Sequence, residues 1–500
     1  MRRIGVFALL FLLSLCTATG FAQNATTSLR GVVNDPSGAV VPGATITLNA
    51  PATGQKIVTT SKGDGEYQLQ QIPPTKYTIV VTAPGFGSQS KSAELLVNQP
   101  ATINFSLSVM GSNEVVDVTE AAQTLNTTDA TLGGATDNAT IQALPSEERN
   151  VPELLSLQPG VLFLPQDNTS RTGSVNGGRS DQGNITIDGV DDNDQVNGYA
   201  FTGVLRETQD SVEEFRVTTS NADADAGRSS GAQVSLVTKS GTNKFHGAAY
   251  EYFRPTNTVS NQYFNKQAQL ESGLGNRPPK LIRHIFGADV GGPIFKNKLF
   301  FFANYEAKRQ SESQTVTQTT PTALYQQGVV QYQANGATVG LTAGQFKQLD
   351  TNNGCAVCNT AAYPNDPGAN PNSLAYFNAM PAANGNLTGD GLNTGSYTFV
   401  SPLPQSANTS IVKIDYTPSD KHHIFVRGNL QKDVIPGTEQ FPGQPASSST
   451  ISNNKGIAAG DTWTINQNMV NDIRYGYTRQ GTGVSGSRLW GLCELPFHGE

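Results

Sequence analysis

Apolar and polar side chains alternate along much of the second half of the chain. In residues 411–416, Ile414 lies on the opposite side from Lys413 and Asp415. The same alternation covers residues 299–308, 424–429 and 473–478. A period of two is typical of a β-strand with one apolar and one polar face. A helix is indicated only at 154–161, where Pro159 and Gly160 end it. The pattern therefore predicts a mainly β protein.

Short β-type runs separated by turns also fill residues 29–108. Turn sequences stand at 35–38 (Asp-Pro-Ser-Gly) and 62–65 (Lys-Gly-Asp-Gly), while residues 45–48 and 77–81 alternate. Strands at such short spacing, with no helix between them, predict a small antiparallel β-sandwich over 29–108.

From residue 244 onward, short and long connections alternate. Residues 293–298, 417–422 and 466–471 are short turns, whereas 310–404 is a long stretch rich in Gln, Asn, Gly and Ala. This asymmetry is typical of outer-membrane barrels, whose strands face lipid on one side and a watery lumen on the other. A soluble sandwich also has alternating strands, and the connection lengths favour the barrel. About seven strands of roughly 10 residues fit this region.

Charge and motif content exclude two classes of function. Lys and Arg number 33 against 40 Asp and Glu, a net charge of −7, which excludes a basic nucleic-acid binder. The chain has no His-Glu-x-x-His and no phosphate-binding loop. We therefore expect no catalytic residues, no cofactor and no metal site.

The N-terminus predicts export. Arg2 and Arg3 precede an apolar run at 4–15, and small residues before residue 23 predict cleavage of a signal peptide, residues 1–22. The run is too short for a membrane anchor, which needs ~20 apolar residues. A lipoprotein signal at Cys16 fits poorly, because a Leu precedes it where a small residue belongs.

Cysteine use agrees with an exported protein. Cys355 and Cys358 lie in a loop rich in Gly, Asn and Pro, with no second Cys-x-x-Cys and no nearby His pair to complete a zinc site. In an oxidising compartment we expect a small disulfide between them, with a redox motif as the alternative. His422 and His423 are interpreted as turn residues.

Four motifs in the predicted sandwich carry a family resemblance. They are 31–35 (Gly-Val-Val-Asn-Asp), 41–44 (Val-Pro-Gly-Ala), 63–67 (Gly-Asp-Gly-Glu-Tyr), and 72–74 (Ile-Pro-Pro) followed by Tyr77. They resemble the carboxypeptidase regulatory-like domain, although Thr75 stands where that family usually has Gly. Residues 29–108 contain no His or Cys for a zinc site, so we interpret them as a binding or spacer module.

A longer series of ordered motifs follows. It comprises 144–145 (Leu-Pro), 149–150 (Arg-Asn), 154–161, 175–180 (Val-Asn-Gly-Gly-Arg-Ser), 184–191 (Asn-Ile-Thr-Ile-Asp-Gly-Val-Asp), 213–217, 227–231 and 234–243. The series resembles the plug of Oar-like TonB-dependent outer-membrane receptors. The resemblance implies an α+β plug domain over 121–243. The first strands of a 22-stranded transmembrane β-barrel would then cover 244–500.

A β-prone run at 113–120 lies between the sandwich and these motifs. The resemblance makes it a candidate TonB box, formed by Glu114, Val115, Val116, Asp117, Val118 and Thr119. Such a segment is expected to be extended and unpaired, so that it adds as a strand to the sheet edge of the periplasmic protein TonB. A last edge strand or a plain linker is the alternative.

Charged residues within the plug motifs are the candidate contacts. Arg149, Arg179, Asp188 and Arg228 are interpreted as structural ion pairs that hold a plug in a polar lumen, in preference to ligand contacts. Residues 188–194 are acidic enough to suggest calcium, but they lack the Gly and Glu of an EF-hand. A calcium loop of another type is the weaker alternative.

The resemblance implies a function. We expect a TonB-dependent importer in the outer membrane of a Gram-negative bacterium, in contact with TonB, outer-membrane lipid and an extracellular solute such as a glycan or a metal chelate. A surface adhesin or carbohydrate-binding scaffold without transport is the alternative. Residues 490–500 lack alternation and a terminal aromatic strand, so a truncated copy of a longer receptor is expected.

Overall fold

The computed structural model describes residues 25–108, 116–118, 130–144, 146, 149, 151–164, 173–199, 202–222, 226–227, 231–271, 275–345, 371–466 and 469–486. Several predicted features lie outside these residues: the signal peptide 1–22, Arg228, Cys355, Cys358, and Glu114, Val115 and Thr119 of the candidate TonB box.

The N-terminal part is a two-sheet β-sandwich. Its strands are β1 (Thr27–Asn34), β2 (Thr45–Asn49), β3 (Lys56–Thr60), β4 (Glu66–Ile72), β5 (Thr75–Thr82), β6 (Gln89–Leu95), β7 (Ala101–Thr102), β8 (Phe105–Ser106) and β9 (Val116–Val118). One sheet has the order β4-β1-β7 with β8 also paired to β1, and the other has the order β3-β2-β5-β6-β9. Leu29, Ile46, Tyr67 and Tyr77 belong to the buried core between them. The sandwich is not purely antiparallel, because β7, β8 and β9 pair in parallel with their neighbours.

A middle domain, residues 130–238, follows. Its elements are β10 (Leu132–Asp137), α2 (Asn138–Ala143), η1 (Val151–Leu157), β11 (Val161–Phe163), β12 (Gly173–Val175), η2 (Ser180–Gln182), β13 (Asn184–Ile187), β14 (Val190–Asp191), η3 (Gln209–Ser211), β15 (Val212–Ser220) and β16 (Gln233–Thr238). Its main sheet has the order β10-β15-β16-β13-β14.

The short helix of the middle domain differs from the prediction for 154–161. It is a 3₁₀ helix, η1, which ends at Leu157. The Gln158 N–H donates to the Leu155 carbonyl, three residues back, as in a 3₁₀ turn. Pro159 has no N–H to continue the ladder, and Gly160 turns the chain at a φ of 83°. The α2 helix was not predicted; the Asp137 side chain caps it by accepting from the Thr140 N–H.

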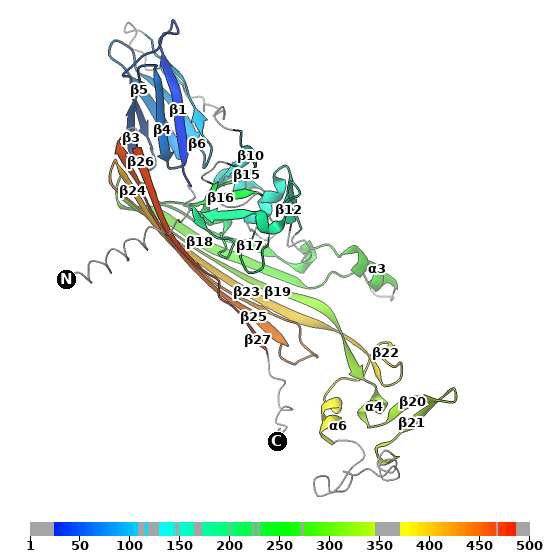
Figure 1. Ribbon diagram of the computed structural model, residues 1–500. Coiled ribbons are helices and arrows are strands. Elements are labelled where there is room, and N and C mark those ends of the chain that lie inside the picture. The colour runs from blue at the N-terminus through cyan, green and yellow to red at the C-terminus, as the bar shows by residue number, and fades with distance from the viewer. Residues whose placement is uncertain are drawn as a thin grey trace, which may run out of the picture.

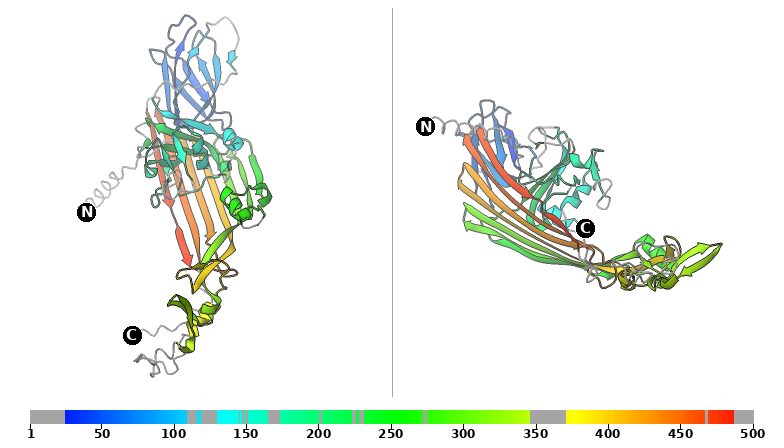
Figure 2. Two further views of the ribbon diagram at one scale, coloured as in Figure 1. Left: turned by 90° about the vertical axis from the view of Figure 1, so that its right-hand side faces the viewer. Right: turned by 60° about the horizontal axis from the view of Figure 1, so that its bottom comes forward.

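The remaining strands form one large antiparallel sheet. They are β17 (His246–Arg254), β18 (Leu281–Phe295), β19 (Leu299–Pro321), β22 (Leu387–Thr388), β23 (Thr394–Ser419), β24 (His422–Pro436), β25 (Ser448–Asn466), β26 (Met469–Arg479) and β27 (Thr482–Gly486). The main order is β17-β18-β19-β23-β24-β25-β26, so the sheet does not close on itself within the described residues. The sheet is a curved trough of tilted strands (Figure 1), and the middle domain lies on its concave side (Figure 2).

Both ends of the long polar stretch predicted at 310–404 are strand, because β19 continues to Pro321 and β23 begins at Thr394. Pairing of β19 with β23 continues from Leu299↔Tyr416 to Pro321↔Thr394. The β19 extension is rich in Thr and has Val316 as the one apolar residue between 310 and 320, so the hydrophobic pattern did not predict it as strand. The extended hairpin ends in an arm with α4 (Ala323–Gln326), β20 (Val330–Ala334), β21 (Ala337–Leu341) and α6 (Pro371–Asn378). This arm lies at the opposite end of the molecule from the sandwich (Figure 1).

Two further helical segments, η5 (Thr256–Thr258) and α3 (Tyr263–Glu271), connect β17 to β18. Across the part of the chain that the structure describes, no helix is both long enough and apolar enough to span a membrane.

Candidate functional site

The large sheet exposes its apolar face and buries its polar face. On β23, Val412 and Ile414 are 48% and 41% exposed, whereas the intervening Lys413 and the next residue Asp415 are 6% and 3% exposed. On β19, Asn304 and Glu306 are likewise buried, and Tyr305 between them is exposed. This is the reverse of a soluble sandwich, which buries its apolar face. The outer face therefore suits contact with lipid, and the inner face suits a polar partner.

The polar partner on the inner face is the middle domain, and Asp188 lies at the centre of the contact. Asp188 and Gly189 form the two-residue turn between β13 and β14, with φ values of 49° and 78°. Positive φ at both positions is typical of a type I′ hairpin turn, for which Asp-Gly is a favoured sequence. The Asp188 carboxylate accepts from the Thr238 N–H at 3.0 Å and from the Thr238 hydroxyl at 2.7 Å. The turn thus fixes the carboxylate against the end of β16.

Three cations of the large sheet converge on this turn. The Lys413 Nζ lies 3.3 Å from the Asp188 Oδ1 and donates to the Thr238 carbonyl at 3.0 Å. The Arg427 Nε lies 3.4 Å from the Asp188 Oδ2. The Arg474 guanidinium donates to the Asp188 backbone carbonyl at 2.7 Å. Burial by itself raises the pKa of Asp188, but Lys413, Arg427 and the Thr238 hydrogen bonds outweigh it and hold the pKa below its usual value.

Two further buried carboxyl groups complete the charged cluster. The Glu207 Oε1 lies 3.5 Å from Arg427 and accepts from Asn429 at 2.8 Å. Burial raises the pKa of Glu207 to about 7, against the attraction of Arg427. Burial, and the nearby carboxylate of Glu207, raise the pKa of Asp192 well above its usual value. At neutral pH this part of the middle domain therefore carries less negative charge than the number of its Asp and Glu residues implies.

A second contact joins Arg149 to the large sheet. Arg149 is 8% exposed, lies 2.5 Å from Asp210 and has its guanidinium 3.8 Å from the Tyr252 ring centre. Its Nε lies 3.9 Å from Glu306, which accepts from the Tyr250 hydroxyl at 3.0 Å. Arg149 thus forms an ion pair within the middle domain and packs against the large sheet, which we call the wall.

The other predicted candidates lie elsewhere or have other partners. Arg179 is exposed and pairs at 2.8 Å with Asp181, two residues away, so it does not join either cluster. In the acidic segment 188–194, Asp192 accepts from the Leu205 N–H, and Asp194 accepts from the N–H groups of residues 196 and 197. Among the described residues, no group of three or more His, Cys, Asp or Glu could hold a metal ion.

Several residues of the contact were not singled out from the sequence. Arg206 forms a two-point ion pair with Asp433 at 2.7 and 3.1 Å, and its N–H donates to Gln431 at 2.9 Å. Glu207 and Arg474 were missed as well. The sequence did contain a signal for the charged residues of the large sheet. A single charge on the polar face of a predicted barrel strand indicates an ionic or polar partner inside the barrel.

Three residues of the candidate TonB box, Val116–Val118, are paired in this structure. Val116–Val118 form β9, the edge strand of the sandwich, and run parallel to β6 with Gln89↔Val116 and Lys91↔Val118 in register. This differs from the expected unpaired segment and corresponds to the edge-strand alternative. The outer edge of β9 has no partner strand among the described residues.

Comparison with known protein families agrees with this architecture. A model of the outer membrane beta barrel domain matches residues 237–489, just over half of the chain, and the chain belongs to this family. A model of the carboxypeptidase regulatory-like domain matches residues 28–108. The protein is thus an outer-membrane protein with an N-terminal regulatory-like domain.

Individual relatives extend the comparison. The chain is similar to the TonB-dependent transporter Oar of Myxococcus xanthus, with 28% identity over 300 residues, 58% of this chain and 27% of that protein. This confirms the predicted resemblance to Oar-like receptors, and the relative is named a transporter. The chain spans about a quarter of the length of this curated relative.

Two solved outer-membrane proteins are also similar. The transporter YddB of Escherichia coli has 11% identity and a TM-score of 0.42, over 70% of this chain and 39% of that chain. The ferric enterobactin receptor PfeA of Pseudomonas aeruginosa, solved as a mutant with enterobactin, has 10% identity and a TM-score of 0.38, over 70% and 41%.

Proposed function

We propose that the protein is a TonB-dependent receptor that binds an extracellular solute and imports it into the periplasm. In this proposal residues 121–243 are the plug, residues 244–500 belong to the barrel wall, and a signal peptide at 1–22 directs export. The solute, a glycan or a metal chelate among the candidates, binds from the side of the arm.

The observation that carries the proposal is the buried ionic contact between Asp188 and the wall residues Lys413 and Arg427. A charged domain held inside a sheet whose outer face is apolar is what a plugged membrane pore requires. The contact also gives the plug a defined resting position. Import would need these ion pairs to separate, and a pull from TonB is the proposed source of the work. Binding of TonB by itself favours the shifted plug only through a difference in its affinity for the two states.

TonB binding by residues 114–119 tests the proposal. The purified periplasmic domain of TonB should bind the full chain in detergent micelles. Deleting residues 114–119 should abolish that binding, because the partner's strand would have no edge to pair with. Val116→Pro, which removes one backbone donor, should weaken binding, whereas Val118→Thr should leave it intact. Equal binding by the wild type and the deletion would exclude residues 114–119 as the TonB box.

A surface adhesin is the second candidate, and the extended hairpin favours it. Strands β19 and β23 have 23 and 26 residues, whereas about 10 suffice to cross a membrane. The surplus carries the arm away from the wall, as a binding structure on the cell surface would need. An adhesin would bind its target equally well in cells that lack TonB.

A further inference from the structure

The sandwich is docked on the middle domain through the loop between β6 and β7. Val97 in this loop is fully buried and forms a small apolar cluster with Ala25 and Val237 of the middle domain's last strand. The Val97 N–H donates to the Oε1 of Glu214, on β15. This contact joins the two domains at one buried point.

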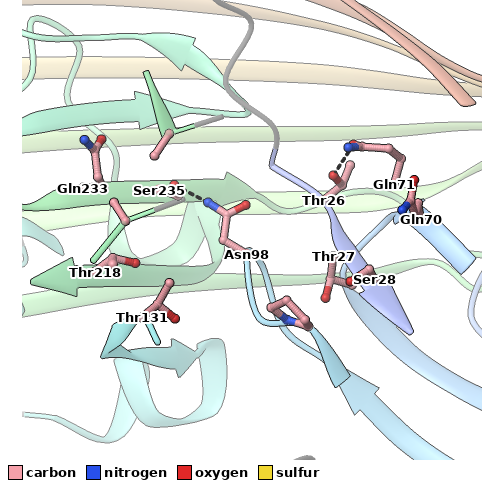
Figure 3. A pocket seen from close by; sticks show the side chains of 13 residues that line it. Thr26, Thr27, Ser28, Gln70, Gln71, Asn98, Thr131, Thr218, Gln233 and Ser235 are labelled. Atoms are coloured by element: carbon pink, nitrogen blue, oxygen red, sulfur yellow. Dashed lines mark hydrogen bonds between the residues drawn. The ribbon is translucent and has the colours of Figure 1, made fainter. Parts of the chain in front are cut away.

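The rest of the interface between the sandwich and the middle domain is polar and contains a cavity. This cavity of about 280 Å³ lies between the domains. Figure 3 shows that uncharged polar side chains line it, such as Gln71 from the sandwich and Thr218 and Gln233 from the middle domain. The Asn98 Nδ2 donates to the Ser235 Oγ at 2.9 Å across it. A cavity with such walls suits water.

Besides Asn98–Ser235, the Arg216 guanidinium donates to the Gln99 Oε1 at 3.5 Å across this interface. The sandwich also contacts the segment before the large sheet, where the Asn243 N–H donates to the Ala52 carbonyl at 2.8 Å. Such sparse polar contacts are typical of transient interfaces between domains.

Glu214 is the ionisable group at this point. Its side chain is 4% exposed. Burial raises the pKa of Glu214 to about 8, and the neighbouring carboxylates of Glu213 and Glu94 add to the effect, while the Val97 N–H and Arg216 oppose it. On the paired strand β10, Asp137 stands opposite Glu214 in register. Glu214 is consequently protonated and uncharged at neutral pH while the domains are docked.

Undocking reverses this balance. In water the pKa of the Glu214 carboxyl returns toward 4.5, its usual value, so it releases its proton at neutral pH. A group whose pKa is raised in one state stabilises that state at low pH, and the stabilisation is lost as the pH rises toward the raised value. Docking must therefore weaken as the pH increases through the neutral range.

We propose that the Val97–Glu214 contact is a releasable latch between the sandwich and the middle domain, closed while Glu214 carries its proton and open when it ionises. The latch has a consequence for the candidate TonB box, because β9 pairs with β6, the strand that leads into the Val97 loop. Opening would let the sandwich carry β9 away from the middle domain. That consequence rests on the proposed function, whereas the latch itself does not.

Pulsed electron paramagnetic resonance on the full chain tests the latch. Spin labels go on Lys62→Cys in the sandwich and Val196→Cys in the middle domain, both exposed positions, with Cys355, Cys358 and Cys493 replaced by Ser. We expect one narrow distance at pH 6 and a growing population of longer distances by pH 9. The docking constant should fall by up to tenfold per pH unit between about 5 and 8.

Two variants identify the group responsible. Glu214→Gln keeps an oxygen for the Val97 N–H but cannot ionise, so its docked fraction should not change with pH. Glu213→Gln, the neighbouring carboxylate, should retain most of the wild-type pH dependence. The latch is overturned if the wild-type distances do not change with pH, or if Glu214→Gln follows the same pH dependence as the wild type.

Binding of the TonB periplasmic domain, measured at pH 6 and pH 9 on the same samples, separates the two proposals. If TonB binds at neither pH while the distances change and Glu214→Gln abolishes the change, the proposed function fails and the latch is supported. If TonB binds but the distances are constant, the latch fails and the proposed function is supported.

Discussion

Removing the Lys413 ammonium should uncouple the middle domain from the wall. Lys413 and Asp188 have side chains only 7% and 5% exposed, so neither charge can be solvated when its partner is lost. In Lys413→Met, Asp188 retains Arg427 but loses its nearest ammonium, and the Thr238 carbonyl loses a donor. Breaking a buried pair in this way typically costs about 3–5 kcal/mol. We expect the free energy of opening of β13 and β16 to fall by this amount.

Native-state hydrogen exchange in detergent micelles measures that free energy strand by strand. Asp188→Asn alone should also be destabilising, and the double variant should cost less than the sum of the two single variants, because the pair is then removed as a unit. Arg179→Met is the matched control, since its pair with Asp181 is 73% and 37% exposed and should contribute less than about 1 kcal/mol. A loss below about 1 kcal/mol in Lys413→Met, or full additivity with Asp188→Asn, would refute the reasoning.

Three further predictions concern the wall and its contact. Ile414→Arg places a charge on the outer face of β23 and should cost about 2–4 kcal/mol of folding in lipid vesicles if Ile414 lies near the midplane; a variant that folds as well as Ile414→Val would contradict a lipid-facing surface. A Cβ on Gly476 would lie 2.1 Å from a Val190 methyl, so Gly476→Ala should lower the exchange protection of β14, whereas Gly483→Ala, with open space around it, should not. Glu207, with its pKa raised to about 7, stabilises the fold below pH 4.5 and loses that contribution as the pH rises through 7. In Glu207→Gln the free energy of unfolding should therefore fall less between pH 5 and 8 than in the wild type. An unchanged slope would show that Glu207 is not the titrating group.

Local patterns allowed part of the site to be predicted. Asp188 stands in an Asp-Gly turn between two β-type runs, and Lys413 stands alone on the polar face of an alternating strand. Each of these two signals depends on neighbouring residues in the sequence. The pairing of Asp188 with Lys413 cannot be predicted in this way, because 225 residues separate them and the curvature of the sheet brings them together.

Other features depend on burial, which motifs do not encode. Arg149 and Arg179 belong to equally plausible motifs, yet one is buried against Tyr252 and the other is exposed. Likewise the run at 116–118 predicts a strand, but nothing in the sequence shows that β6 is its partner. The polar extension of β19 shows the limit of hydrophobic periodicity, since a strand outside the membrane needs no apolar face.

The orientation of the molecule in the outer membrane is the most direct test of the proposed function. Ala337→Cys lies in the arm and Lys62→Cys in the sandwich, both exposed, in a chain whose other cysteines are replaced by Ser. A membrane-impermeant maleimide should label Ala337→Cys in intact cells and Lys62→Cys only after the outer membrane is permeabilised. Labelling of Lys62→Cys in intact cells would place the sandwich outside, beyond the reach of TonB, and would contradict the importer.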